Sequence, residues 1–457
     1  MQSLSKLMTI MLLCLSWLTA QAADHSGTLP VIFINAFDSI TSKTDYVNAT
    51  YYIDPMGCEG FEPVGTEDNP LPLFIRGHGN WTWTGNFEKK AYRIKLVNNK
   101  PLLGMAKNKH FVLLAHADGG KESFFRNTAV FELARQLNLE FTPHQQPVEL
   151  VLNGEYMGLY FLTENIRVDK GRVEITEQED GESNPELIKG GWLVEIDNGV
   201  ASNQIRGNVR NTELPYFLVT YHSPEQLSSE QRTYLLQQVN QMLSAVYTTD
   251  LSSTDWENII DMDQLARFYL VNEMVDNVEA FYGSCYIHKD LEENRWRFGP
   301  VWDAGHAFNV WHPKDCFIYQ ATGNWGPCIM NKIAHFPRFK EYLSQLWYET
   351  HEQLYDSLVL YLYHFTEQIA QAAVCDHKRW PQYGTSNAWQ SLGHCLELLN
   401  RKYAFLTYRM DPEFVKGIHS PTLSRCNNGF YDLQGRSMAV PSYKGIYIRN
   451  GKKYINH

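Results

Sequence analysis

The sequence predicts a two-lobed α+β fold, with a β-rich N-terminal lobe and a helical C-terminal lobe. Two observations favour this fold class. Up to residue 164, short runs of β-branched and aromatic residues alternate with turns that contain Gly, Pro or Asn. Further along, and above all after residue 339, apolar residues recur at the spacing of amphipathic helices. The chain has 457 residues, 44% of them hydrophobic, which is enough to bury the cores of two lobes.

Residues 1–22 indicate a secretory signal peptide. Lys6 is their one charge, an apolar run extends from Leu7 to Leu18, and small residues precede a cleavage position after Ala22. The apolar run is too short to span a membrane, and no later stretch of the sequence reaches the required length. We therefore expect an exported bacterial protein without a transmembrane span, either secreted or retained at the cell surface or in the periplasm.

The formal net charge of −11 at pH 7 limits the possible partners. An acidic surface repels phosphate backbones and anionic membranes, so we expect no nucleic-acid partner. The chain has eight cysteines, and an oxidising compartment would allow two short-range pairs, Cys316 with Cys328 and Cys375 with Cys395. The alternative is that all the cysteines are small buried hydrophobic residues.

Three strands are predicted before the first chemical motif, at residues 31–37, 45–53 and 71–75. Residues 57–70 form a loop rich in Gly, Pro and acidic residues between the second and third strands. We treat residues 23–70 as an N-terminal β region.

The turn RGHGN follows the third strand. Gly77 and Gly79 allow the backbone to approach an anion closely, because amide groups in such turns form anion-binding nests. Asn80 is a third candidate in the same wrap. The alternative is that two glycines between strands make an ordinary hairpin.

The strand that begins at Tyr92 carries the best candidate for a phosphate-binding cation. Tyr92 and Ile94 alternate with Arg93 and Lys95, so the two basic residues share one face, which we expect to point inward. A buried lysine needs a carboxylate or phosphate partner, and we predict that Lys95 contacts phosphate. The alternative is a solvated lysine on an exposed sheet face.

A helix and a hairpin are predicted next. Apolar residues four positions apart predict an amphipathic helix at 124–137. Asn153 and Gly154, which lie between two apolar runs, predict a type I′ hairpin. The later predicted elements are a strand at 190–197 and helices at 228–246, 262–275, 339–373 and 387–410.

Together these parts follow the order of a protein-kinase-like phosphoryl-transfer site, which needs a phosphate wrap, a cation and carboxylates for metal and nucleophile. These motifs resemble those of the CotH family of spore-coat-type kinases. That family's typical motifs are RGN-S-TW, KKPYRIKL, NGEY-x-GxY-xx-E and WDxD. The corresponding segments of this chain are RGHGNWTW, KKAYRIKL, NGEYMGLYFLTE and FGPVWDAGH. The similarity covers most of the chain, and we place the kinase-like domain at 71–415. It implies a protein-kinase-like fold, ATP and Mg²⁺ as cofactors, and Ser or Thr of a surface or secreted protein as acceptor.

The resemblance also implies roles for individual carboxylates. Glu132 on the predicted helix would pair with Lys95, with Glu122 as the alternative partner. Glu164 lies at a strand end where the family's fold places adenine contacts. Asp303 would be a metal ligand and part of the catalytic set.

Two of the three aspartates expected from the resemblance are altered in this chain. Glu279 occupies the position of the catalytic base, and its extra methylene can displace a contact by about 1 Å and cost roughly 10²-fold in rate. Gly305 replaces the second aspartate of WDxD. Asp276 can substitute as the base if the loop is shifted. We therefore predict phosphoryl transfer that is slow or absent, with binding retained.

Two other classes of function remain open. The first is a catalytically degraded, pseudokinase-like scaffold that binds a protein or a glycan, and the aromatic-rich segment 311–325 suits stacking on sugars. The second is a hydrolase that uses a carboxylate pair such as Glu195 and Asp197, although the sequence contains neither GxSxG nor HExxH.

Residues 416–457 change character and predict short strands around a turn at Asn450 and Gly451. This tail resembles part of a type IX secretion sorting domain. The alternative is a small β-cap on the helical lobe.

Overall fold

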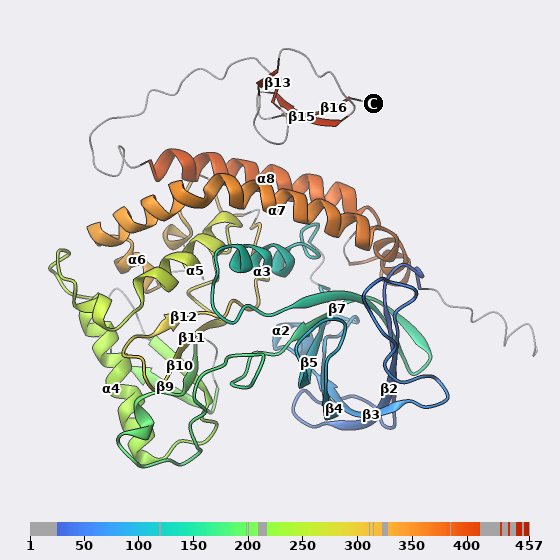
Figure 1. Cartoon of the computed structure of the whole chain (residues 1–457), viewed down its shortest axis with the longest axis horizontal. Helices are drawn as coiled ribbons and strands as arrows, with labels where there is room; N and C mark the ends of the chain where they lie inside the picture. The colour runs from blue at the N-terminus through green and yellow to red at the C-terminus, as the bar shows by residue number, and fades with distance from the viewer. Residues whose placement is uncertain are drawn as a thin grey trace, which may run out of the picture. The chain divides into compact units, whose positions relative to one another are not determined.

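The computed structural model describes residues 25–117, 120–197, 199, 201–208, 217–309, 311–313, 315–321, 328–383 and 385–411, and in the tail residues 430–431, 437–438, 445–449 and 452–456. The fold is mixed α+β, with a β-barrel, a second sheet and long C-terminal helices (Figure 1). The chain forms two compact units. The first comprises Met1–Lys121, Gln145–Glu164 and Thr366–Trp389, and the second comprises Glu122–His144, Asn165–Phe365 and Gln390–His457. The predicted signal peptide, residues 1–22, lies outside the described residues.

The first unit contains a closed barrel with the strand order β1-β2-β3-β4-β5-β7-β6. Its strands are β1 (Val31–Ala36), β2 (Val47–Asp54), β3 (Leu71–Gly77), β4 (Tyr92–Lys100), β5 (Asn108–Leu114), β6 (Gln145–Leu152) and β7 (Glu155–Glu164). Neighbouring strands are antiparallel except β1 and β6, which run parallel with Val31 opposite Glu149. This parallel pair closes the barrel, and closure removes the unpaired edges that an open sheet would expose.

The alternation of residues along β4 determines which side chains fill the barrel. Tyr92, Ile94 and Leu96 are buried inside it, whereas Arg93 and Lys95 are half-buried on its outer face. The prediction that the two basic residues share a face is confirmed. The prediction that this face points inward is wrong, because the barrel closes around the apolar face.

The hairpin between β6 and β7 has the predicted geometry. Leu152 pairs with Glu155 across a two-residue turn. Asn153 and Gly154 both have positive φ, 54° and 79°, as a type I′ turn requires.

A buried ion pair ties the end of α7 (Pro337–Arg379) to this barrel. Within the first unit, Asp376 Oδ1 accepts hydrogen bonds from Lys89 Nζ at 2.7 Å and from the Leu159 amide at 2.8 Å. Gly158, at φ 99°, makes room for the carboxylate, since a Cβ there would lie 2.1 Å from the same oxygen. Burial lowers the pKa of Lys89, and the charge of Asp376 opposes that effect.

The second unit contains a five-stranded antiparallel sheet with the order β12-β11-β8-β10-β9. Its strands are β8 (Trp192–Ile196), β9 (Gln204–Gly207), β10 (Phe217–Ser223), β11 (Cys285–Lys289) and β12 (Arg297–Phe298). The helix α4 (Ser229–Val246) packs on β9, where a Cβ at Gly207 would lie 2.7 Å from Leu243. Ser228 and Gln231 form a capping box that fixes the start of α4.

Four further helices lie close to the predicted positions: α3 (Arg126–Gln136), α5 (Met262–Met274), α7 and α8 (Ala388–Arg409). The short helix α6 (Met330–Ile333) and the turns α2 (Trp81–Thr84), η1 (Leu187–Lys189), η2 (Asp255–Asn258) and η3 (Ile318–Gln320) were not predicted. In the second unit α7 and α8 pack antiparallel (Figure 1), with Ser344 bonded to the Met410 carbonyl and His351 bonded to Tyr403. Among the described residues, we find no helix that is both long and apolar enough to cross a membrane.

The tail forms a small sheet with the order β14-β13-β15-β16. Its strands are β13 (Phe430–Tyr431), β14 (Ser437–Met438), β15 (Gly445–Arg449) and β16 (Lys452–Asn456). The predicted turn at Asn450 and Gly451 lies outside the described residues.

All six described cysteines are free thiols: Cys58, Cys285, Cys316, Cys328, Cys375 and Cys395. The pairings of Cys316 with Cys328 and of Cys375 with Cys395 are therefore wrong. Burial raises the pKa of Cys328 to about 11 and also raises the pKa values of Cys285 and Cys395, as expected for small buried hydrophobic residues.

Candidate functional site

Four carboxylates of the second unit lie around one edge of its sheet. Glu195 is on β8, and Asp197 is the first residue after that strand. Asp303 lies in the segment after β12, and Glu279 lies in the segment before β11. Because β11 is antiparallel to both β8 and β12, the ends of those two strands and the beginning of β11 meet at the same edge. A Cβ at Gly283 would lie 3.3 Å from Glu279 Oε1 and 3.5 Å from Asp197 Oδ1, so these two carboxylates flank the same small space.

The carboxylates of this cluster raise one another's pKa values. Burial, followed by the charges of Asp303 and Asp197, raises the pKa of Glu279 to about 8. Desolvation by neighbouring protein atoms raises the pKa of Asp303, and the charges of Glu195 and Asp197 raise it further, while Asp303 itself is exposed on the surface. Simultaneous ionisation of Asp197, Glu279 and Asp303 is therefore unfavourable unless a proton or a cation neutralises part of their charge.

Histidines lie beside two of these carboxylates. His306 Nε2 is 3.4 Å from Glu279 Oε2, and His222 Nε2 is 2.7 Å from Glu195 Oε2. Burial lowers the pKa of His306, and the positive charge of Arg126 lowers it further. Within the described parts of the chain, no group of three or more His, Cys, Asp or Glu residues is already arranged to hold a metal ion.

Asp303 has a backbone conformation that is unusual for its residue type. Its φ is +50°, in the left-handed region, where a residue with a Cβ is disfavoured and must be held by its surroundings. Gly305, which replaces a carboxylate of the family pattern, lies next to it, and a Cβ at Gly305 would be 3.4 Å from Asp303 Oδ1. The space that a second aspartate would need is thus beside Asp303.

Asp276 lies in a different environment from Glu279. It is buried, and its Oδ1 lies 3.0 Å from Lys402 Nζ and 2.8 Å from His312 Nδ1. Lys402 also contacts Glu273 Oε1 at 2.5 Å. Burial alone lowers the pKa of Lys402, but Glu273 and Asp276 together raise it above its ordinary value. The Asp276 carboxylate thus has a cationic partner, Lys402, within the protein, and sequence reasoning missed Lys402, Glu273 and His312.

The Gly-rich turn lies in the first unit and is closely packed. A Cβ at Gly77 would lie 2.5 Å from the Trp83 indole, and Gly79 has a φ of 91°. The side-chain oxygen of Asn80 accepts a hydrogen bond from Lys43. The backbone carbonyl of Asn80 accepts a hydrogen bond from the Trp83 amide at 3.2 Å. The turn therefore requires glycine at both positions, and it leads into α2.

Basic residues gather on the outer face of the barrel beside this turn. Arg76 on β3 is directly opposite Arg93 on β4, and Lys95 follows on the same face, opposite His110 of β5. Burial, followed by the charges of Arg93, Arg76 and Lys43, lowers the pKa of His78 to about 3. Like charges directly opposite one another destabilise a sheet, so a bound anion would stabilise this face.

The two remaining predicted residues, Glu132 and Glu164, each contact other residues of their own unit. Glu132 of α3 contacts Arg135 Nη2 at 3.1 Å and Gln136 Nε2 at 2.8 Å, and it belongs to the second unit whereas Lys95 belongs to the first. Glu164 is buried at the end of β7, where its Oε1 accepts the Ala106 amide at 3.1 Å.

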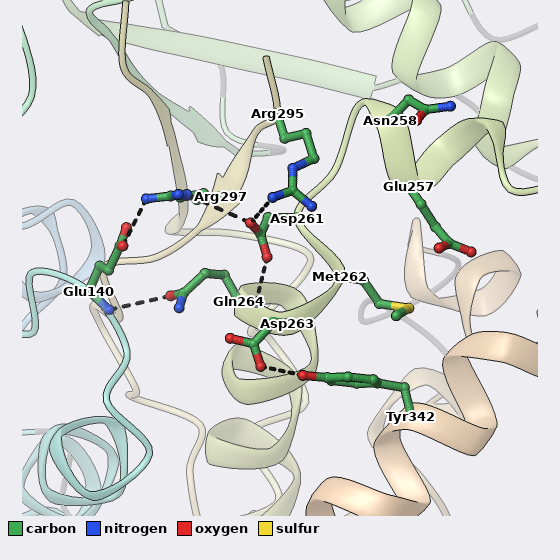
Figure 2. A pocket seen from close by; sticks show the side chains of 10 residues that line it. All are labelled: Glu140, Glu257, Asn258, Asp261, Met262, Asp263, Gln264, Arg295, Arg297 and Tyr342. Carbon is green, nitrogen blue, oxygen red and sulfur yellow. Dashed lines mark hydrogen bonds and ion pairs between the residues drawn. The ribbon is translucent and has the colours of Figure 1, made fainter. Parts of the chain in front are cut away.

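A separate polar pocket of about 460 Å³ opens at the start of α5 (Figure 2). Ion pairs line it: Glu140 contacts Arg297 at 2.8 Å, and Asp261 contacts Arg295 at 3.1 Å and Arg297 at 3.8 Å. Figure 2 shows this chain of charges beside Tyr342, which donates to Asp263. The carboxylates neutralise the arginines here, and none of the predicted site residues lines the pocket.

Comparison with known proteins adds two findings. The profile of the family described as CotH kinase protein matches residues 75–406, well over half of the chain and a range that contains both the basic face and the carboxylate cluster. No curated protein matches the chain.

Proposed function

Because this chain belongs to the CotH kinase protein family, we propose that it is an exported atypical protein kinase that transfers phosphate from ATP to Ser or Thr of a surface or secreted protein. The observation that carries the proposal is the carboxylate cluster of Asp197, Glu279 and Asp303 at one sheet edge. Phosphoryl transfer depends mainly on positioning and on neutralising phosphate charge, and carboxylates that repel one another favour binding of a cation.

Asp303 is the proposed ligand of Mg²⁺, with Asp197 beside it. Mg²⁺ prefers oxygen ligands and is often held by one or two protein carboxylates together with substrate phosphates, which suits a site without a complete protein cage. When bound, Mg²⁺ would neutralise charge on the phosphates of ATP. Lys95 is the proposed phosphate-binding cation, supported by its place on a face with Arg76 and Arg93, and Gly77, Gly79 and Asn80 form the proposed phosphate wrap.

Glu279 is the proposed base that accepts the proton of the acceptor hydroxyl. A carboxyl group whose pKa is raised to about 8 is a stronger base than an ordinary glutamate, and a catalytic base works best with a pKa near the working pH. We assign Asp276 a different role: its contacts with Lys402 and His312 hold the segment between α5 and Glu279 in place.

We further propose a protein-kinase-like two-lobed fold for residues 71–415, preceded by the signal peptide and the β region 23–70. Residues 416–457 are proposed to be a sorting-like tail that acts during secretion to the cell surface. Glu132 and Glu164 keep their proposed roles as ion-pair partner and adenine-side residue.

The second candidate function is a pseudokinase-like scaffold that binds a protein or a glycan. Two features favour it: Gly305 supplies no carboxylate, and Glu279 is longer than the expected aspartate. Trp311, whose side chain is 91% exposed, would suit stacking on a sugar ring.

Nucleotide binding by the mature chain tests both proposals. Calorimetric titration of ATP with and without Mg²⁺ should give Mg²⁺-dependent binding that Asp303→Ala or Lys95→Ala abolishes. Asp255→Ala in η2 and Lys109→Ala on β5 serve as matched controls and should bind like the wild type. Unchanged affinity in both site variants would refute the assignment. Transfer of labelled phosphate to a generic acceptor protein then separates the enzyme from the scaffold.

A further inference from the structure

We propose that α3 positions the carboxylate of Asp303, with Asn127 and Phe131 as the positioning residues. The inference rests on the metal-binding role proposed above for Asp303. It concerns contacts within the second unit only.

Two contacts from α3 hold the residues on either side of Asp303. The amide of Ala304 donates a hydrogen bond to Asn127 Oδ1 at 2.8 Å. The ring of Trp302 stacks on Phe131, with the ring centroids 6.3 Å apart and the planes inclined by 28°. Ala304, Asn127 and Phe131 are all buried, so water does not compete for these contacts.

The two positioning residues lie on the same face of the helix. Residues four positions apart in an α-helix are neighbours on its surface, and Asn127 and Phe131 have this spacing. Asn127 is also in the first turn of α3, which begins at Arg126. A single rigid element therefore holds both flanks of Asp303.

The backbone at Asp303 explains why such a hold is needed. A left-handed conformation is disfavoured at a residue with a Cβ and persists only where neighbouring contacts fix it. The far end of the same segment is fixed separately, because the Phe308 amide donates to the Val275 carbonyl at 2.5 Å. Between these anchors, the Asn127 contact is the one that fixes the peptide unit immediately after Asp303.

A matched pair of variants isolates this contact. Asn127→Leu keeps the shape of the side chain and removes the acceptor, whereas Asn127→Asp keeps an acceptor oxygen. Gln136→Leu removes a side-chain amide from the same helix that contacts Glu132, and it serves as the control. Phe131→Leu tests the second contact and also serves if Asn127→Leu does not fold.

Two measurements on the mature chain read out the effect. Hydrogen exchange of the peptide that contains Ala304 reports whether the amide has lost its acceptor, with no metal present. Luminescence of Tb³⁺, excited through Trp302 and checked with Asp303→Ala, reports metal affinity without any turnover. We expect Asn127→Leu to speed exchange at Ala304 and to weaken Tb³⁺ binding roughly tenfold, Asn127→Asp to restore slow exchange, and Gln136→Leu to change neither.

The possible results separate this inference from the proposed function. Unchanged exchange at Ala304 in Asn127→Leu overturns the positioning role, and so does faster exchange with unchanged Tb³⁺ affinity. If Asn127→Leu does not fold, Phe131→Leu decides through metal affinity: unchanged Tb³⁺ binding in that variant overturns the positioning role. Wild-type protein that binds no Tb³⁺ contradicts the metal role of Asp303 instead, and the exchange data then still decide whether α3 holds the loop.

Discussion

At the scale of single residues, the protonation of Glu279 depends on Asp303 and Asp197, which lie beside it in the carboxylate cluster. In metal-free protein the folded-state pKa is about 8, above the ordinary value of 4.5 that the unfolded chain keeps. Between these two values the folded state binds more protons than the unfolded state. The contribution of Glu279 to the free energy of unfolding therefore falls as the pH rises from about 4.5 to about 8.

We accordingly predict that Glu279→Gln is more stable than the wild type at pH 8, and that this advantage disappears below pH 4.5. The physical reason is that glutamine carries no charge for Asp303 and Asp197 to repel. Thermal unfolding in EDTA across this pH range measures the difference. Parallel pH profiles for the two proteins would mean that Glu279 titrates normally.

A second prediction concerns the altered carboxylate positions. The double variant Glu279→Asp with Gly305→Asp should raise the rate of phosphate transfer, by up to about 10²-fold, because it restores the shorter base and a second ligand. The Cβ of the new aspartate would lie at contact distance, 3.4 Å, from Asp303 Oδ1. The rate of transfer to an acceptor protein measures the gain.

Gly393→Asp is the control for that experiment, because a Cβ at Gly393 meets nothing within 4 Å and the residue lies on α8. If the wild type already transfers phosphate quickly and the double variant is no faster, another carboxylate does the work, and our account of a weakened site is wrong.

Sequence reasoning identified some of these residues and missed others for a physical reason. Glu279 and Asp303 stand in motifs that can be recognised along the chain. The sequence pattern did mark Asp197, but only as half of a hydrolase pair with Glu195. Its place beside Glu279 depends on β8 and β12 both pairing with β11, and such long-range pairing leaves no local signal.

At the scale of elements, the ion pair between Lys89 and Asp376 fixes the end of α7 to the barrel of the first unit. Both side chains are almost fully buried, 1% and 3% exposed, so removal of one partner leaves an uncompensated charge in a dry environment. This contact also spans a long separation in sequence, from residue 89 to residue 376.

We predict that Lys89→Met and Asp376→Leu each lower the free energy of unfolding by about 3–5 kcal/mol, whereas the double variant loses clearly less than their sum. The reason is that the double variant leaves no unpaired charge. Chemical denaturation of the four proteins in the cycle measures the coupling. Additive losses would show that the two side chains act independently.

Elements with a local signal were predicted well. Asn153-Gly154 predicted the β6–β7 hairpin, and the helix predicted at 228–246 matches α4 within one residue at its start. Closure of the barrel was not predicted, because the parallel pairing of β1 with β6 joins Val31 to Glu149 across more than a hundred residues. The outward direction of Lys95 follows from that closure, and this is why the inward prediction failed.

At the scale of the whole molecule, the polypeptide passes several times from one unit to the other along its sequence. Each unit is assembled from three separate segments, and the segments of the two units alternate along the chain. The basic face is on the first unit and the carboxylate cluster is on the second. No single cut in the chain therefore yields either unit complete, so each experiment requires residues 23–457 as one piece.

The free cysteines lead to a last prediction at this scale. The melting temperature should be the same with and without excess dithiothreitol, because all six described cysteines are thiols and several have raised pKa values that keep them unreactive. Differential scanning calorimetry makes the comparison. A lower melting temperature in the reductant would reveal a stabilising disulfide.

These thiols have a practical consequence for production of the protein. A fold that needs no cross-link among Cys58, Cys285, Cys316, Cys328, Cys375 and Cys395 can be made as residues 23–457 in the reducing cytosol of an expression host, with no oxidase or isomerase supplied. Cys58, Cys316 and Cys375 are half-buried, unlike the fully enclosed Cys285, so a fluorescent or spin label directed to Cys58 on the first unit requires replacement of the other two by serine. Such a label reports on the barrel, while the carboxylate cluster on the second unit stays unmodified.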